Sequence, residues 1–385
     1  MILGIMGDTH EVEANIIKKV SADLKKRGAE VIIHTGDIES QHLDINLFCG
    51  LPVVCVLTNQ QQFDRQFSFP PSGWVFTRPG NSMISPADKA QNVMENIIAS
   101  KLAIANRIVN LGEVVIYAGH ERSTDVLMNG QKFNEFIEIL NQVYEGVRYI
   151  FTGHTHHQFL IQRNGFSWIN PGAVIPLFYE HEYAVVNTAK GEIVFTRLSQ
   201  TTTATQSQTV GIISDTGNIS ERDSQFWQQL AIEFHERDVS IVIVGGGLRT
   251  SDIGRSELAD FHVYYSLSPL VKNNLQELNN WHLISNDNPI LEICSHYFLI
   301  QHNLGIDLHG QTEVEMIKLI REELKHHHHI DIVICGGIHD ALFEEQQDVM
   351  IINPGDARNH RKFVTICFPR CEITFSAVRL GTNKI

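Results

Sequence analysis

The chain has 385 residues, 43% of them hydrophobic, and carries 30 Lys and Arg against 44 Asp and Glu. A formal net charge of -14 argues against a protein that tracks extended nucleic acid through many basic contacts to phosphates. No apolar run reaches the roughly 18 residues of a membrane span, and the opening MILGIMGDTH lacks the features of a signal peptide. We therefore expect a cytoplasmic protein with no membrane partner, long enough for two domains.

The first half alternates between predicted strands and helices. Residues 60–85 are interpreted as an irregular loop and 86–110 as a long helix capped by Ser85. The other expected elements are, in chain order, strand 2–6, helix 14–27, strands 31–34, 52–57 and 113–117, helix 132–144, and short strands 158–162, 166–169, 182–187 and 192–197. This alternation places polar residues at the carboxyl ends of strands, where open α/β sheets carry their sites.

Two short stretches follow apolar runs and carry ligand-type side chains two residues apart. They are GDTH at 7–10 and GHTH at 153–156. Side chains at i and i+2 share one face of extended backbone, so each stretch can aim two ligands at one point. A mixture of Asp oxygen and His nitrogen suits Mn, Fe, Zn, Ni or Co better than Ca. The hypothesis is a site for one metal ion, or for two.

Further ligand-type side chains follow the other apolar runs of the first half. The full set is Asp8, His10, Asp37, Asn59, His120, His154 and His156. A single polar residue at a strand end is typical of a turn or a cap, but seven at one sheet edge would be a large coincidence. The order DxH, GD, Asn, a lone His and GHxH over residues 1–197 resembles the calcineurin-like metallophosphoesterase family.

The resemblance implies a fold and a dinuclear metal site. The fold would be α/β, a four-layer α/β/β/α sandwich with mixed sheets. One metal would be held by Asp8, His10, Asp37 and His156, and the other by Asp37, Asn59, His120 and His154. Asp37, Asn59 and His120 are the expected catalytic residues, and the cofactors are two divalent transition-metal ions, with Mn favoured over Fe, Ni, Co or Zn. The implied activity is hydrolysis of a small phosphorylated substrate, a phosphodiester or an activated monoester, by a hydroxide shared between the metals.

The sequence departs from the family pattern at one position. Gln60 follows Asn59, where many members carry the His credited as general acid. Glutamine can donate a hydrogen bond but cannot give up a proton, and loss of a general acid typically costs about 10² to 10⁴ in rate. The alternative function is therefore a weak or silent binding scaffold that keeps the fold, with or without the metals. His34, inside a predicted strand, is interpreted as a core residue or as a support for the site.

The second half repeats the pattern of the first. The echoes are VGIISDTGN at 210–218 with LGIMGDTHE at 3–11, IVIVGGG at 241–247 with VIIHTGD at 31–37, IVICGGIHD at 332–340 with YIFTGHTHH at 149–157, and INPGD at 352–356 with INPGA at 169–173. Four echoes in the same order indicate a tandem duplication. We expect a metal-binding domain over 1–200, a linker over 201–209 and a degenerate second domain over 210–385, the two domains packing as an intramolecular pseudo-dimer.

The second copy loses most of the ligands. His10, Asp37 and His154 align with Gly217, Gly247 and Gly337. Asp215, His339 and His302 are the ligand types that remain. Two or three scattered ligands cannot hold a pair of metals, so we predict a catalytic centre in the first domain alone.

Overall fold

The computed structural model describes residues 1–57, 73–77, 107–120, 130–144, 146–175, 181–198, 207–216, 224–248, 252–266, 280–285, 289–301, 320, 322, 324–325, 327, 329–337, 340–346 and 349–379. The chain divides into two compact units. The first comprises Met1–Lys190 and Arg197–Gln200, and the second comprises Gly191–Thr196 and Thr201–Ile385. Among the described helices, none is both long and apolar enough to cross a membrane.

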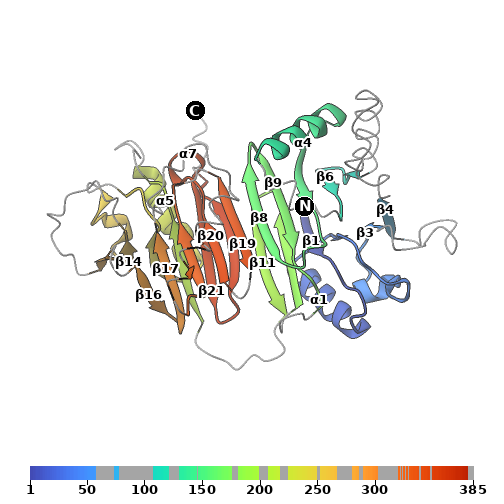
Figure 1. Cartoon of the computed structure of the whole chain (residues 1–385), viewed down its shortest axis with the longest axis horizontal. Helices are drawn as coiled ribbons and strands as arrows, with labels where there is room; N and C mark the ends of the chain where they lie inside the picture. The colour runs from blue at the N-terminus through green and yellow to red at the C-terminus, as the bar shows by residue number, and fades with distance from the viewer. Residues whose placement is uncertain are drawn as a thin grey trace. The chain divides into compact units, whose positions relative to one another are not determined.

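The first sheet of the first unit has the strand order β10-β1-β2-β3-β4. Its members are β10 (His181–Asn187), β1 (Ile2–Met6), β2 (Val31–His34), β3 (Val53–Val56) and β4 (Trp74–Thr77). Strands β1 to β4 run parallel, and β10 pairs antiparallel with β1. The central strands are almost fully buried, which accounts for their continuous apolar sequences. Their carboxyl ends meet at one edge of the sheet (Figure 1).

The second sheet of the first unit has the order β8-β9-β7-β6-β5. Its members are β8 (Gln158–Arg163), β9 (Phe166–Pro171), β7 (Val147–Phe151), β6 (Val115–Ala118) and β5 (Ile108–Asn110). Strands β6, β7 and β9 are parallel neighbours, while β5 and β8 are antiparallel edges of this group. Both sheets are therefore mixed, as expected.

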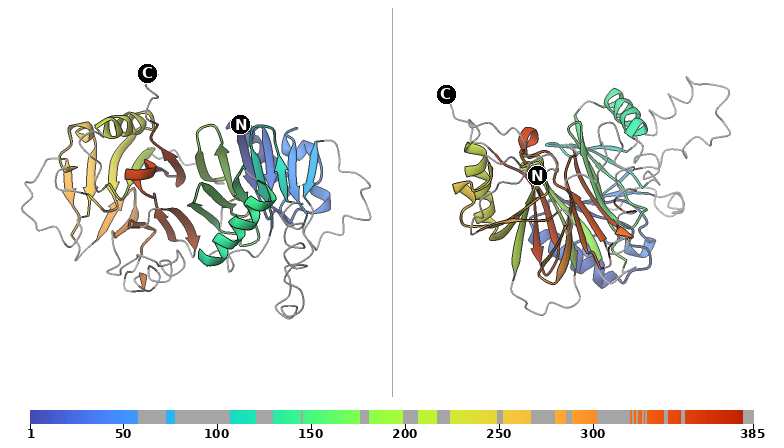
Figure 2. Two further views of the ribbon diagram at one scale, coloured as in Figure 1. Left: turned by 90° about the horizontal axis from the view of Figure 1, so that it is seen from above. Right: turned by 60° about the vertical axis from the view of Figure 1, so that its left-hand side comes forward.

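Two helices within the described residues pack on the sheets of the first unit. Helix α1 (Ala14–Lys26) buries Ile17, Val20 and Leu24 and contacts β10 of the first sheet. Helix α4 (Gly130–Val143) places Phe136 against Tyr117 of β6 and Trp168 of β9, and Figure 2 shows this helix in teal beside the green strands of the second sheet. The predicted α/β fold class with mixed sheets is confirmed.

The second unit has the same strand connections. Its first sheet has the order β15-β14-β13-β12-β21-β22-β11, and its second sheet the order β16-β17-β18-β20-β19. The strands are β11 (Glu192–Leu198), β12 (Gln208–Ile213), β13 (Val239–Val244), β14 (His262–Tyr265), β15 (Trp281–Leu283), β16 (Ile290–Ile293), β17 (His296–Gln301), β18 (Ile332–Cys335), β19 (Ala341–Gln346), β20 (Val349–Asn353), β21 (Lys362–Phe368) and β22 (Glu372–Ala377). Strands β12 to β15 are parallel, β21 is antiparallel to β12, and β17, β18 and β20 are parallel. The order β21-β12-β13-β14-β15 thus matches β10-β1-β2-β3-β4, and the order β16-β17-β18-β20-β19 matches β5-β6-β7-β9-β8. Helices α5 (Ser224–Glu236) and α7 (Ala357–His360) complete the described part, and α5 buries Trp227 and Phe234 in the core.

The structure corrects three expectations about local structure. Trp74–Thr77 forms strand β4, although we expected an irregular loop over 60–85; the rest of that loop lies outside the described residues. The helix expected over 86–110 is wrong at its end, because Ile108–Asn110 is strand β5, and its earlier part also lies outside the described residues. Strand β12 begins at Gln208, inside the segment 201–209 that we expected to be a linker.

Candidate metal centre

Each described ligand candidate follows the carboxyl end of a strand in the first unit. Asp8 follows β1, Asp37 follows β2, His120 follows β6 and His154 follows β7. Strands β1 and β2 are parallel neighbours in the first sheet, and β6 and β7 are parallel neighbours in the second. The six described candidates therefore come from four loops at the edges of two sheets, not from the single sheet edge that we expected. Asn59 and Gln60 lie outside the described residues.

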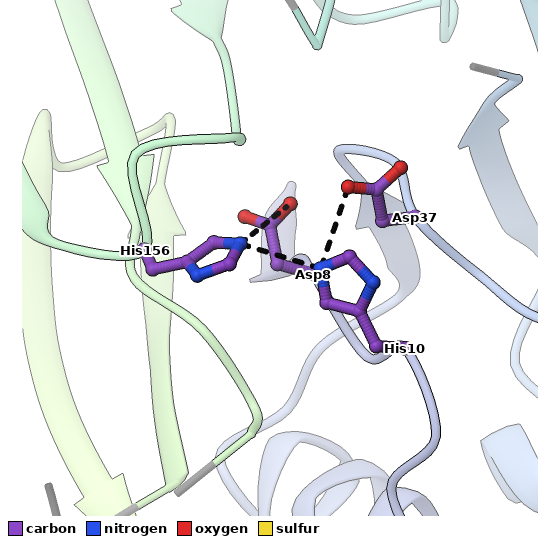
Figure 3. A group of neighbouring side chains, drawn as sticks. All are labelled: Asp8, His10, Asp37 and His156. Atoms are coloured by element: carbon purple, nitrogen blue, oxygen red, sulfur yellow. Dashed lines mark hydrogen bonds and ion pairs between the residues drawn. The ribbon is translucent and has the colours of Figure 1, made fainter. Parts of the chain in front are cut away.

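One group consists of Asp8, His10, Asp37 and His156, whose ligand atoms all lie within 4.8 Å of one another (Figure 3). His10 Nε2 lies 3.4 Å from Asp37 Oδ2 and 3.3 Å from His156 Nε2. His156 Nε2 lies 3.9 Å from Asp8 Oδ1. Two carboxylate oxygens and two imidazole nitrogens thus converge on one point.

A second group consists of Asp37, His120 and His154, also within 4.8 Å. His120 Nδ1 donates to the Thr35 carbonyl over 2.9 Å, so in the neutral ring Nε2 is the nitrogen that can bind a metal ion. That Nε2 lies 3.0 Å from Asp37 Oδ2. Asp37 therefore belongs to both groups.

The backbone at these residues differs from our expectation. We attributed the convergence to extended backbone, and that explanation is wrong. Five candidates have a positive φ, namely Asp8 (48°), His10 (29°), Asp37 (50°), His154 (77°) and His156 (61°). Left-handed backbone costs a residue other than glycine about 1–2 kcal/mol, although Asp and His tolerate it better than most. The ligands converge because the loops turn back sharply just past the strand ends, and such local strain is common at functional sites.

Two glycines leave room for the side chains of the site. A Cβ at Gly36, whose φ is +130°, would lie 2.3 Å from His120 Nδ1. A Cβ at Gly153 would lie 2.7 Å from Thr35 Oγ1 and 3.0 Å from Asp8 Oδ2. Glycine is required at both positions because larger residues would displace the groups that form the site.

Burial and neighbouring charges shift the pKa values of the side chains at the site. Asp8 is fully buried, and burial raises the pKa of its carboxyl to about 7 in spite of the nearby His120. Burial also lowers the pKa of His156, and the charge of His10 adds to that effect. Burial alone would lower the pKa of His120, but the hydrogen bond with Asp37 and the charges of both carboxylates raise it. The buried carboxylates thus gain most from a positive charge placed among them.

The side chains present fit a divalent cation. His10 Nε2 and His156 Nε2 face each other at 3.3 Å beside carboxylate oxygens, an arrangement in which lone pairs repel unless a proton or a cation lies between them. Asp8 is a buried acid whose ionised form a cation would stabilise. Borderline nitrogen with hard oxygen suits transition metals.

A buried hydrogen-bond chain, which sequence analysis did not foresee, links the turn after β1 to the turn after β2. Gly36 N donates to His34 Nδ1 over 3.3 Å, so the proton of this neutral imidazole is on Nε2. His34 Nε2 then donates to Thr9 Oγ1 over 3.2 Å, and Thr9 Oγ1 donates to the Asp37 carbonyl over 3.3 Å. Burial lowers the pKa of His34 to about 3, which keeps the ring neutral. His34 thus supports the turns that present Asp8 and Asp37.

The second unit keeps this backbone frame. Asp215, with φ 53°, accepts from Gly337 N at 3.0 Å through both carboxylate oxygens, as Asp8 accepts from His154 N at 3.1 and 3.0 Å. Thr216 Oγ1 donates to the Gly247 carbonyl over 3.3 Å, the counterpart of the bond from Thr9 to Asp37. Among its described residues, no group of three or more Asp, Glu, His or Cys side chains is placed to hold a metal. His302 and His339 lie outside the described residues.

The sequence profile of one family matches this part of the chain. Residues 1–191 match the Calcineurin-like phosphoesterase superfamily domain. The first unit therefore belongs to the calcineurin-like phosphoesterase superfamily, a family of metal-dependent hydrolases, and the resemblance inferred from the motifs is confirmed. No curated protein matches the chain.

Solved structures that match this chain cover about half of it. An archaeal phosphodiesterase has 16% identity and a TM-score of 0.37, over 51% of this chain and 100% of its own. The phosphoesterase Yfce from E. coli has 16% identity and a TM-score of 0.31, over 53% and 97%. Vps29 from Entamoeba histolytica, solved with Zn²⁺, has 14% identity and a TM-score of 0.33, over 53% and 95%.

Proposed function

We propose that the first unit is a cytoplasmic phosphoesterase that uses two divalent transition-metal ions. One ion would be held by Asp8, His10, Asp37 and His156, and the other by Asp37, Asn59, His120 and His154. The strongest support is that Asp37 is common to both described groups, each with ligand atoms within 4.8 Å of one another. We propose Mn as the metal, with Fe, Ni, Co or Zn as alternatives, since mixed nitrogen and oxygen donors suit transition metals in general.

The residues of the site prepare it for attack on a phosphate ester. When bound, two cations would supply a hydroxide at neutral pH and would stabilise negative charge on the phosphoryl oxygens. Asp37 contributes the carboxylate common to both groups. His120 is held for coordination through Nε2 by its hydrogen bond to Thr35. Since Gln60 cannot give up a proton, we propose small phosphodiesters or activated monoesters with good leaving groups as substrates.

Hydrolysis of bis(4-nitrophenyl) phosphate with Mn²⁺ tests this proposal. The parent chain should release nitrophenolate and bind two ions, and Asp37→Asn should lose the activity together with at least one ion. Asp215→Asn is the matched control, since it changes the aspartate of the second unit that accepts from a backbone N–H in the same way as Asp8. Two bound ions without turnover, with Mn, Ni, Co and Zn each tried, would instead support the alternative of a metal-holding binding scaffold. Absence of metal binding would contradict both.

We also propose that the second unit is a degenerate tandem copy. The support is the common strand order of the two units and the equivalent bonds of Asp215 and Asp8 to backbone N–H groups. A complete copy would hold its own pair of metals, whereas a degenerate copy adds none. Metal analysis should therefore find two ions per chain, unchanged by Asp215→Asn.

A further inference from the structure

A cavity of about 590 Å³ opens beside His10 in the first unit. His10 belongs both to its wall and to the Asp/His group described above, so the cavity borders the candidate metal centre. Three glutamates also line it, Glu11, Glu13 and Glu39. Its other described walls are three aliphatic side chains and His181. A group esterified to a phosphate at the metal centre could extend into this space.

The described lining of the cavity is acidic. Its three carboxylates are partly open to solvent, and no Lys or Arg is among the described residues that line it. Carboxylates grouped in this way repel a second anionic group and attract a cation. The aliphatic walls would pack against a short methylene chain.

His181 adds an unpartnered acceptor to the same cavity. Its side chain is only 2% exposed, and its Nδ1 donates to the Val174 carbonyl. The proton of the neutral ring is therefore on Nδ1, and Nε2 carries a lone pair. Among the described residues no group donates to this buried Nε2. A buried acceptor without a donor is unfavourable, so an N–H group that enters beside this ring would find a partner.

We propose that this acidic pocket, formed by Glu11, Glu13, Glu39 and His181, binds an ammonium group carried on the alcohol part of a phosphodiester substrate. The inference rests on the proposed phosphoesterase function and narrows its substrate class to aminoalkyl phosphodiesters. The phosphate lies at the metal centre, the methylene chain contacts the aliphatic walls, and the ammonium group donates to the carboxylates and to His181 Nε2. In hydrolysis, an oxygen from water bonds to phosphorus and the P–O bond to the other alcohol breaks. That leaving alcohol takes up a proton from the water, and the alcohol with the ammonium group stays esterified to the phosphate.

Two chromogenic diesters that share the same leaving group test whether the pocket binds an ammonium group. They are 2-aminoethyl 4-nitrophenyl phosphate and propyl 4-nitrophenyl phosphate, which differ only in the charged end of the retained alcohol. We expect kcat/KM to be about tenfold higher for the aminoethyl diester, because exposed ion pairs each contribute a factor of about 1.4 to 5. The preference should weaken with added salt, which screens such charges.

The triple variant Glu11→Gln, Glu13→Gln, Glu39→Gln should bring the kcat/KM values of the two diesters together. Glu30→Gln is the control, since Glu30 belongs to the same unit, is exposed and pairs with the N-terminal amine instead. Equal kcat/KM values for the two diesters in the parent would contradict ammonium binding in this pocket. A preference that persists in the triple variant would also contradict it.

A binding measurement separates this inference from the proposed function. If neither diester is hydrolysed, calorimetry with 2-aminoethyl phosphate and propyl phosphate on the Mn²⁺-loaded chain decides. Tighter binding of the aminoethyl compound, lost in the triple variant, would uphold the pocket while the hydrolase proposal fails. Equal binding of the two compounds would overturn the pocket.

Discussion

Replacing His34 by valine tests how the turns around the metal centre are held. His34 is fully buried, accepts from Gly36 N and donates to Thr9 Oγ1. In the second unit, Val244 ends the matching strand β13. His34→Val leaves the Gly36 N–H without its acceptor, at a cost of about 1–3 kcal/mol. Because the supporting groups of metal ligands typically contribute about 10- to 100-fold in affinity, Mn²⁺ binding should weaken by a similar factor.

The same variant should change the response to acid. Burial lowers the pKa of His34 to about 3, whereas an unfolded His has a pKa of about 6.5. Between these values the unfolded chain binds an extra proton, so the stability of the fold falls as pH falls below about 6.5. From about pH 7.5 to about pH 5, this single group should remove about 2 kcal/mol from the free energy of unfolding of the parent. The variant lacks this contribution.

Urea unfolding of metal-free parent and variant at both pH values provides the measurement, because bound metal would add its own pH dependence. Asp8 has the opposite effect: burial raises its pKa to about 7, so protonation stabilises the fold as pH falls. This contribution is common to parent and variant and cancels in the comparison. An equal loss of stability in the two proteins would refute a neutral, buried His34. Unchanged Mn²⁺ affinity would refute its support of the site.

Three further predictions concern the glycines, the second unit and the metals. Gly36→Ala should sharply weaken Mn²⁺ binding measured by calorimetry, because a Cβ there would lie 2.3 Å from His120 Nδ1; normal affinity would show that the loop adapts. Asp215→Asn should cost the second unit about 1–2 kcal/mol in urea unfolding by weakening the bond from Gly337 N, without loss of metal; a lost ion would assign it a ligand role. Chelation should lower the Tm of the first unit, since metal binds its folded state; an unchanged Tm would contradict a structural contribution of the metals.

Much of the metal centre could be predicted because short sequence motifs at the ends of predicted strands identify its ligands. Each ligand segment follows an apolar strand, and parallel strands bring their carboxyl ends to one edge within each sheet. The sequence therefore indicated that Asp8, Asp37, His120 and His154 lie close together, and the described geometry agrees. The expectation of a single sheet edge was wrong, because the segments come from two sheets. The expected roles of Asn59 and Gln60 stay predictions, since both lie outside the described residues.

The rest depended on contacts between distant segments. The left-handed backbone at the ligands leaves no periodic signal, so extended chain was the wrong explanation of their convergence. Strand β4 was missed because four residues behind a Gly- and Pro-rich stretch are too short to show alternation. The acidic pocket draws on Glu11, Glu39 and His181, which no spacing rule connects. The role of His34 required knowing that its ring reaches Thr9.

The left-handed turns also explain why a lost centre of this kind is hard to regain. At the positions matching Asp37 and His154, the second unit has Gly247 (φ 68°) and Gly337 (φ 84°), which adopt these angles without strain. Replacing a ligand by glycine thus removes backbone strain. The reverse mutation restores that strain, and only metal binding could then compensate for it. A larger residue at position 247 would also clash, because its Cβ would lie 2.8 Å from the Cα of Asp215. Under the tandem duplication proposed above, the relaxed glycine turns would therefore oppose recovery of the ligands.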